Sequence, residues 1–309
     1  MTAAIEIRGL TKAYGTKRAL DEVDLTVAEG SVFGFLGPNG AGKTTTLRIL
    51  TGLARPTSGE ARVFGRDVVS ATNAVRADIG FLPDVPGYYG WMTAREFLRF
   101  AGSLFGLGGK TLDARVEALL DLAGLTGVDT KVGGYSRGMK QRLGVAQALI
   151  NAPKLLMLDE PTSALDPIGR KEVLDMIASL GGRTTVFFST HILADVERVC
   201  DTVAILHDGR VLTQAPITEL KGRYGASRLT VEVTVDADAF AARFAAEPWA
   251  SEVARVNGAT LSITVRDLET ARVAIPAAVA ERGVGLVRLE AGEVSLEEVF
   301  VDLVGGDPR

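Results

Sequence analysis

The chain has 309 residues, of which 47% are hydrophobic, and a formal net charge of −4. It has room for a large domain and a smaller one, and no stretch approaches the roughly 18 apolar residues of a membrane span. The mild acidity argues against a broad nucleic-acid surface, and a single cysteine, Cys200, excludes an intramolecular disulfide and a cysteine-based metal cluster. Because Glu6 already interrupts the first apolar residues, we expect no signal peptide and a cytoplasmic chain.

The first strong motif follows a predicted buried strand at residues 32–36. Residues 37–45 read Gly-Pro-Asn-Gly-Ala-Gly-Lys-Thr-Thr and match the phosphate-binding pattern G-x-x-x-x-G-K-[ST]. Glycines let such a loop bend so that its N–H groups and the next helix N-terminus point at phosphates. Lys43 adds positive charge and Thr44 a Mg²⁺ ligand, which a plain glycine-rich turn would not require. The predicted ATP-binding residues are Gly37, Pro38, Asn39, Gly40, Ala41, Gly42, Lys43, Thr44 and Thr45.

Aromatic residues precede the next predicted helix. Tyr88, Tyr89 and Trp91 lie just before Thr93-Ala-Arg-Glu, a capping box that predicts a helix over residues 97–105. Further on, a Ser-Arg-Gly element at 136–138 leads into a predicted helix over residues 143–150.

Two carboxylates end the apolar strand predicted at residues 155–158. Asp159 is suited to hold Mg²⁺, which prefers hard oxygen ligands, and Glu160 is the candidate general base for the attacking water. Two surface acids at a strand end are the alternative. That alternative loses weight because the same chain carries the phosphate-binding loop.

The segment after residue 222 has a different pattern. Residues 229–235 alternate as a strand, 238–246 predict a helix, and an Asn257-Gly258 turn precedes a strand at 262–265. A helix over 268–282, a strand over 285–289 and a capping-box helix from Ser295 complete a small α+β unit without a catalytic cluster. Before it, an Asp208-Gly209 hairpin closes the predicted first domain.

The order of these motifs, with Ser189-Thr190-His191 after a further strand, resembles the ATP-binding subunit of an ABC transporter over residues 4–220. The resemblance implies an α/β P-loop NTPase of ABC type, with a mixed-sheet core, a helical subdomain near 85–150 and a domain end at 222. Residues 223–309 would form the small α+β domain. Its Ser-Leu-Glu-Glu-Val-Phe ending is similar to the ABC-2-type, drug-resistance-like exporter branch, which suggests a regulatory or dimer-supporting role.

The resemblance also implies that two copies enclose two ATP molecules head to tail. Ser136 and Gly138 would then contact the γ-phosphate bound by the other copy, and Asp166 would connect the two sites. Ordinary helix capping is the alternative for both Ser136 and Asp166. His191 would be the switch histidine that positions Glu160. Tyr14 would stack on adenine, or else pack at the solvent edge.

Two positions depart from the family pattern. Asp84 replaces a glutamine that touches Mg²⁺ and water, so it is either an altered metal ligand or part of a hinge outside the metal site. Arg137-Gly138-Met139 replaces Gly-Gly-Gln but keeps the phosphate-facing positions. The aromatic cluster at 88–91 either docks a membrane subunit or packs its own subdomain.

The favoured function is an ATPase subunit that dimerises on ATP and powers export through a separate permease, at the cytoplasmic face of the cell membrane. One alternative is a soluble ABC-type ATPase acting on DNA or ribosomes, although such chains carry a long coiled coil or tandem cassettes. The other alternative is a regulatory ATP-binding module with slow turnover, and the departure from the family pattern at Asp84 is the reason to retain it.

Overall fold

The computed structural model describes residues 2–224, 227–235, 237–292 and 295–305. They divide into two compact units, Met1–Ile217 and Thr218–Arg309. Our predicted boundary at 222 falls inside α8 (Ile217–Tyr224), the helix in which this division also lies. Within the described ranges, none of the helices is long and apolar enough to cross a bilayer.

The first unit contains a six-stranded sheet whose central strands carry the candidate site. Five of its strands are parallel, and only β10 pairs antiparallel with its neighbour at one edge. Every residue of β3, β7 and β8 is buried, as expected for parallel strands covered on both faces. In spatial order the strands are β10 (Arg210–Pro216), β9 (Thr202–His207), β3 (Val32–Leu36), β8 (Thr185–Thr190), β7 (Leu155–Asp159) and β6 (Ile79–Leu82).

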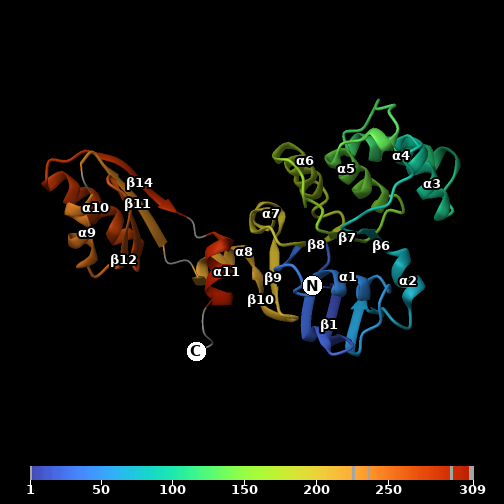
Figure 1. The fold of residues 1–309 in the computed structure, drawn as a ribbon, viewed down its shortest axis with the longest axis horizontal. Coiled ribbons are helices and arrows are strands. Elements are labelled where there is room, and N and C mark those ends of the chain that lie inside the picture. Colours follow the sequence, from blue (N-terminus) through green and yellow to red (C-terminus); the bar gives the residue numbers. More distant parts are fainter. Residues whose placement is uncertain (1, 225–226, 236, 293–294, 306–309) are drawn as a thin grey trace. The chain divides into compact units, whose positions relative to one another are not determined.

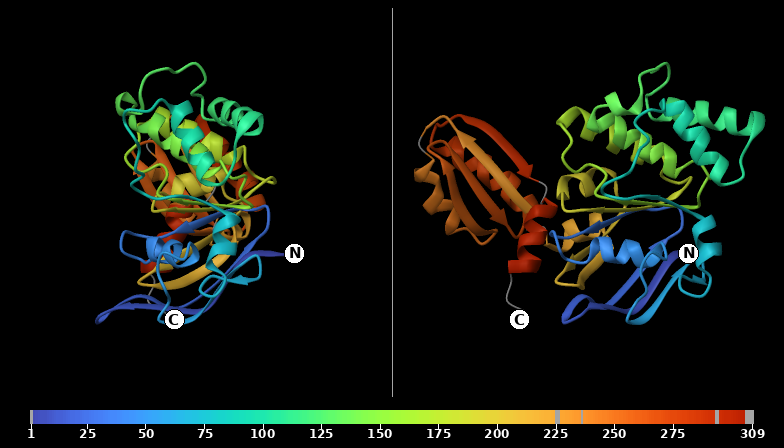
Figure 2. Two further views of the ribbon diagram at one scale, coloured as in Figure 1. Left: turned by 90° about the vertical axis from the view of Figure 1, so that its right-hand side faces the viewer. Right: turned by 45° about the vertical axis from the view of Figure 1, so that its right-hand side comes forward.

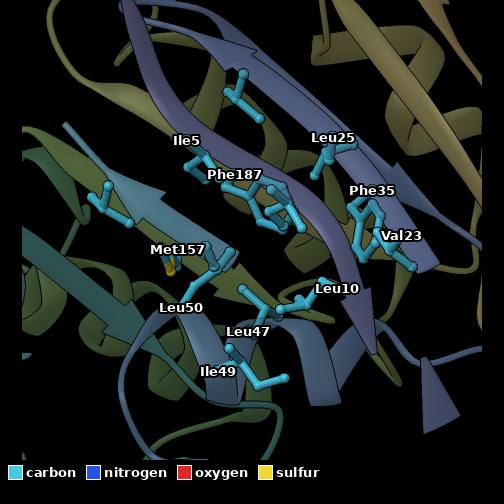
Figure 3. Close-up of a cluster of buried hydrophobic side chains, with 14 of the residues drawn as sticks. Ile5, Leu10, Val23, Leu25, Phe35, Leu47, Ile49, Leu50, Met157 and Phe187 are labelled. Atoms are coloured by element: carbon cyan, nitrogen blue, oxygen red, sulfur yellow. The ribbon is translucent and has the colours of Figure 1, made fainter. Parts of the chain in front are cut away.

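A second, antiparallel sheet of the same unit packs beside the first helix. Figure 3 shows Leu47 and Leu50 of α1 (Lys43–Leu50) lying among apolar side chains of both sheets, including Leu10 and Met157. This shared core fixes the helix that follows the phosphate-binding loop. The antiparallel sheet has the order β2 (Lys17–Ala28), β1 (Ala3–Tyr14), β4 (Ser58–Val63) and β5 (Arg66–Asp67).

Helices form a separate layer of this unit. In Figure 1, α3 to α5 group on the side of the six-stranded sheet away from β1. Thr93 and Glu96 form the predicted capping box: the Glu96 amide donates to the Thr93 hydroxyl and the Thr93 amide to the Glu96 carboxylate. The helices are α2 (Thr72–Ala77), α3 (Ala94–Leu104), α4 (Gly109–Leu122), the 3₁₀ turn η1 (Val132–Gly134), α5 (Arg137–Ala148), α6 (Pro167–Ala178) and α7 (Leu193–Val199).

The second unit contains a four-stranded antiparallel sheet with a βαββαβ order of elements. Its spatial order, β12-β13-β11-β14, places the first strand of the motif beside the third and fourth. Phe240, Phe244 and Ile275 from its helices pack with the buried face of the sheet. The right panel of Figure 2 shows the backbone of this sheet and of its helices, coloured orange to red. The elements are β11 (Ser227–Val233), α9 (Asp238–Ala245), β12 (Ala250–Asn257), β13 (Thr260–Val265), α10 (Leu268–Glu281), β14 (Leu286–Gly292) and α11 (Leu296–Gly305).

Candidate nucleotide-binding site

The phosphate-binding loop joins β3 to α1, and its glycines have distinct structural reasons. Gly40 and Gly42 have φ values of 85° and 114°, in the left-handed region that glycine adopts most readily. Gly37 is needed for space instead, because a Cβ there would lie 2.3 Å from the Leu206 carbonyl oxygen. Helix α1 begins immediately afterwards at Lys43. The loop therefore brings its backbone amides and a helix N-terminus to one point.

The Lys43 side chain lies against this loop, and only 6% of the residue's surface is exposed. Its Nζ donates to the carbonyl oxygens of Gly37 at 2.6 Å and Pro38 at 3.2 Å. Nζ also lies 3.1 Å from Glu160 Oε1, as an ion pair without hydrogen-bond alignment, since that buried oxygen accepts no hydrogen bond. The Lys43 ammonium thus joins the phosphate-binding loop to the end of β7.

Glu160 follows β7 directly, and its backbone is strained. Its φ of 49° is left-handed, and its amide donates to the Ser189 carbonyl at 3.0 Å. Its Oε2 lies 2.8 Å from His191 Nδ1. Because β7 and β8 are adjacent and parallel, their carboxyl ends bring Glu160 and His191 together. The carboxylate is positioned between a cation on one side and an imidazole on the other.

Asp159 is almost completely buried beside Glu160. Its Oδ1 accepts a hydrogen bond from the Ser189 hydroxyl at 2.6 Å. Among the described residues, no three His, Cys, Asp or Glu side chains cluster as a ready-made metal site. Mg²⁺ is commonly bound by one or two protein oxygens together with substrate phosphates, so the hard oxygens of Asp159 and Thr44 fit this ion.

A pocket of about 320 Å³ opens over the phosphate-binding loop. Tyr14 lies at this pocket with 49% of its surface exposed, and the Lys12 ammonium lies 4.8 Å from its ring centroid. Lys17 and Ala19 also line the pocket, and no sequence motif predicted them. The lining residues are Tyr14, Lys17, Ala19, Asn39, Gly40, Gly42, Lys43, Thr44, Thr45, Asp84 and Glu160.

Asp84 also faces a second hollow, of about 540 Å³. Arg137 and Lys140 line this hollow too, so both departures from the family pattern meet in it. Asp84 is exposed and has no ion pair with the described residues. Asp84 therefore lines both the nucleotide pocket and a hollow that contains two basic side chains.

The Ser-Arg-Gly element and Asp166 cap neighbouring helices. The Ser136 hydroxyl accepts from the Met139 amide at 3.2 Å, and Asp166 Oδ1 accepts from the Gly169 amide at 3.1 Å. Ser136, Gly138 and Asp166 are absent from the lining of the nucleotide pocket of their own chain, within the described ranges. Helix capping, the alternative role of Ser136 and Asp166, therefore accounts for their contacts within one copy.

The aromatic cluster separates into a structural and an exposed part. Tyr88 donates its hydroxyl to the Lys140 carbonyl at 2.6 Å, and burial raises the pKa of this tyrosine above its usual range. Tyr89 and Trp91 are exposed, with ring centroids 5.0 Å apart. Packing thus accounts for Tyr88, whereas Tyr89 and Trp91 keep an open aromatic surface.

Sequence patterns missed one buried polar group near the site. Asp195 of α7 is completely buried and accepts hydrogen bonds from the Thr162 hydroxyl and from Arg170 Nε. In the sequence, Asp195 is an ordinary acidic residue at the start of a short helix. Its burial depends on contacts with a turn 33 residues away, which no local pattern indicates.

Comparisons with known proteins agree with this geometry. Residues 20–163 match the ABC transporter family model, and residues 216–304 match that of the C-terminal domain of DrrA1-3-like ATP-binding proteins. A solved ATP-binding subunit of an ABC transporter has a TM-score of 0.64 and 30% identity, covering 72% of this chain and 93% of its own. The dimeric structure of the bacterial ABC transporter cassette MJ0796 has a TM-score of 0.63 and 27% identity, covering 69% and 98%. The chain therefore belongs to the ATP-binding subunits of ABC transporters, and it is an ATPase.

Full-length relatives define the branch. An uncharacterised ABC transporter ATP-binding protein of Bacillus subtilis, YxlF, is 39% identical over 97% of this chain and 99% of its own length. The bacitracin transport ATP-binding protein BcrA of Bacillus licheniformis is 37% identical, over 99% of both chains. The daunorubicin resistance ATP-binding protein DrrA3 of Streptomyces coeruleorubidus is 39% identical, over 99% and 97%. The chain belongs to this DrrA- and BcrA-like branch, whose nucleotide-binding subunits power export. Our predictions of the family, the fold and the ATPase class are confirmed, and the DNA or ribosome alternative is not favoured.

Proposed function

We propose that Glu160 is the general base of ATP hydrolysis in this chain and that His191 positions it. The contact between His191 Nδ1 and Glu160 Oε2, at 2.8 Å, carries this proposal. A carboxylate beside the phosphate-binding loop can take the proton of a water molecule that attacks the γ-phosphate. The left-handed backbone of Glu160 turns its side chain toward Lys43 and His191.

Lys43 has the complementary role of stabilising phosphate charge. Its Nζ lies among two carbonyl oxygens and one carboxylate, so the ammonium is already desolvated where phosphate oxygens would bind. Charge in such a buried position acts more strongly on developing negative charge than it would in water. Amides of the loop at Gly40 and Gly42 would complete the phosphate site.

Mg²⁺ bound at this site would be held by the Thr44 hydroxyl and Asp159. When bound, the ion supplies charge neutralisation across the phosphate oxygens. The Ser189 hydroxyl fixes one oxygen of Asp159 and leaves the other for this role. We keep Asp84 as a further candidate ligand because it lines the same pocket.

Two copies would close on ATP, with Ser136 and Gly138 of each copy facing the nucleotide of the other. Helix α5 begins between these residues, so its N-terminus would be available to a phosphate. The dimeric relative supports this assembly. Tyr14 would stack on the adenine at the rim of the pocket.

The permease that this subunit serves would be a separate integral-membrane chain, which would hold the subunit at the cytoplasmic face of the membrane. The BcrA and DrrA3 relatives, named for bacitracin transport and daunorubicin resistance, support an export direction. The exposed rings of Tyr89 and Trp91 form the surface that we assign to this partner.

Glu160→Gln tests the catalytic proposal most directly, because the amide keeps the side-chain shape but cannot accept the proton at neutral pH. We expect ATP turnover to fall by roughly 100-fold or more, with ATP binding retained and a dimer that persists in ATP by light scattering. Asp175→Asn, on the exposed side of α6, is the matched control and should keep wild-type turnover. Equal turnover of wild type and Glu160→Gln would contradict the proposal.

Copurification tests the partner. The tagged chain would be recovered from detergent-solubilised membranes of its own host, and its partners identified by mass spectrometry. We expect an integral-membrane protein with several apolar spans of about 20 residues each. Recovery only with ribosomes or nucleic acid would contradict the permease assignment.

A further inference from the structure

The buried Asp195 joins three segments that surround the catalytic pair. Its Oδ2 accepts from the Thr162 hydroxyl and its Oδ1 from Arg170 Nε, both at 2.5 Å. Thr162 lies two residues after Glu160, and Asp195 lies four residues after His191. One carboxylate therefore connects the segment after Glu160 to the segment after His191, and both to α6.

A purely stabilising role does not account well for this arrangement. Burying the Asp195 carboxylate has a desolvation cost that its partly exposed partner Arg170 offsets only in part, and well-packed apolar side chains often stabilise a core equally well. A fully hydrogen-bonded buried network instead holds the segments that it joins in one arrangement. Neither Thr162 nor Asp195 lines the nucleotide pocket, so any effect on chemistry would act through other residues.

The geometry that needs support is the turn after β7. Glu160 and Ala164 both have left-handed backbones, with φ values of 49° and 55°. Such conformations persist in residues other than glycine only where surrounding contacts hold them. Thr162 lies between these two residues, and its hydroxyl is bonded to a buried carboxylate. This bond anchors the turn at its midpoint.

We propose that Asp195 is a positioning residue for ATP hydrolysis, acting through Thr162 to keep Glu160 in contact with His191. Without the anchor, the turn would relax and the Glu160 carboxylate would move relative to His191 Nδ1. Arg170 fixes the orientation of Asp195 by occupying its second oxygen. The inference rests on the roles proposed above for Glu160 and His191.

Thr162→Val is the sharpest test because it removes the hydroxyl and keeps the shape of the side chain. We expect kcat for ATP to fall by roughly 10-fold, with the KM and the ATP dissociation constant unchanged, since displacement of a catalytic group affects the chemical step. Thr162→Ser retains the hydroxyl and should restore kcat. Asp195→Ala removes both acceptor oxygens and should lower kcat in the same way as Thr162→Val.

Asp175→Asn is the matched control for an α6–α7 contact. Asp175 accepts a hydrogen bond from Arg198 of α7 at 2.7 Å, on the exposed side and away from the turn. Its kcat should stay close to wild type. Thermal unfolding of every variant distinguishes a loss of positioning from a loss of folding. A variant that lowers kcat and unfolds near the temperature of Thr162→Ser has lost positioning and not the fold.

Combination with His191→Ala tests the pathway of the effect. If Asp195 and Thr162 act through the Glu160–His191 contact, Thr162→Val should lower kcat much less in the His191→Ala background than in the wild type. An equal factor in both backgrounds, or an unchanged kcat in Thr162→Val, would overturn the inference. Failure of the proposed function gives a different result, namely full turnover in Glu160→Gln.

Discussion

Gly138 and Gly169 meet where α5 and α6 cross. A Cβ added to Gly138 would lie 3.4 Å from the Gly169 Cα, and one added to Gly169 would lie 3.5 Å from the Gly138 Cα. The same crossing brings the capping residues Ser136 and Asp166 to neighbouring helix N-termini. Arg137 adds a hydrogen bond from its guanidinium to the Ala164 carbonyl at 3.3 Å. The Ser-Arg-Gly element and the turn after Glu160 are thus in direct contact.

Gly169→Ala should destabilise the first unit by about 1–2 kcal/mol. The new Cβ would lie 2.8 Å from Asp166 Oδ1, which accepts the capping hydrogen bond of α6. Urea denaturation measures the change. Gly134→Ala is the control, because a Cβ there meets no atom within 4 Å and its φ is not left-handed. Equal stability of the two variants would show that the Asp166 cap accommodates the new Cβ.

His191→Ala should reduce kcat for ATP by roughly 100-fold while ATP binding is retained. The imidazole is partly exposed and its contact is with the Glu160 carboxylate, so its removal affects the reacting geometry more than the fold. Steady-state turnover and nucleotide titration measure the two effects separately. His207→Gln replaces the second histidine and should keep most of the activity. A similar loss in both variants would show that the effect is not specific to His191.

Asp21→Asn should lower the unfolding temperature at pH 7 and by less at pH 3. Hydrogen bonds from Arg210 and then Arg18 lower the pKa of the Asp21 carboxyl. A carboxyl whose pKa is lower in the folded state stabilises the fold above its unfolded value of about 3.9 and loses this contribution as the pH falls through the folded value. Melting curves at both pH values, with exposed Asp121→Asn as control, measure the difference. A pH-independent difference would contradict this linkage.

Tyr88→Phe should destabilise the first unit by about 1–2 kcal/mol, because the Lys140 carbonyl loses its hydrogen bond from the partly buried hydroxyl. Thermal or urea unfolding measures the loss. An unchanged stability would indicate that water or another donor replaces the Tyr88 hydroxyl.

Trp91→Ala should leave stability and the basal ATPase rate nearly unchanged and should weaken copurification with the permease. The Trp91 side chain is 65% exposed and its ring contacts Tyr89. Exposed aromatic residues frequently dominate the affinity of interfaces. Leu53→Ala, at another exposed apolar position, controls for a general loss of surface hydrophobicity. Undiminished copurification of Trp91→Ala would exclude this ring from the docking surface.

Local sequence patterns predicted the elements that carry the site. The Thr93–Glu96 capping box, the buried strand before the phosphate-binding loop and the Asp208-Gly209 hairpin all have short-range causes, and the structure contains each of them. The order of motifs also predicted the family. These features depend on residues that are close in sequence, so one sequence is sufficient to predict them.

The contacts around Glu160 were less accessible to prediction. The Lys43–Glu160 ion pair and the Asp195 network depend on strand order and on the meeting of distant turns. Gly37 was expected to bend the chain, whereas the structure requires it because the Leu206 carbonyl comes too close for a side chain. Such reasons arise from tertiary packing and have no local sequence signal.

The backbone at Glu160 has a consequence for how this protein can evolve. Glycine would adopt the same left-handed conformation without a steric penalty, whereas glutamate has a cost of order 1–2 kcal/mol there. Replacement of Glu160 by glycine would relieve this strain, but it would also leave the buried Lys43 ammonium without its carboxylate partner, which has a larger cost. Selection for stability and selection for turnover therefore both retain the side chain at the position that we assign to proton abstraction.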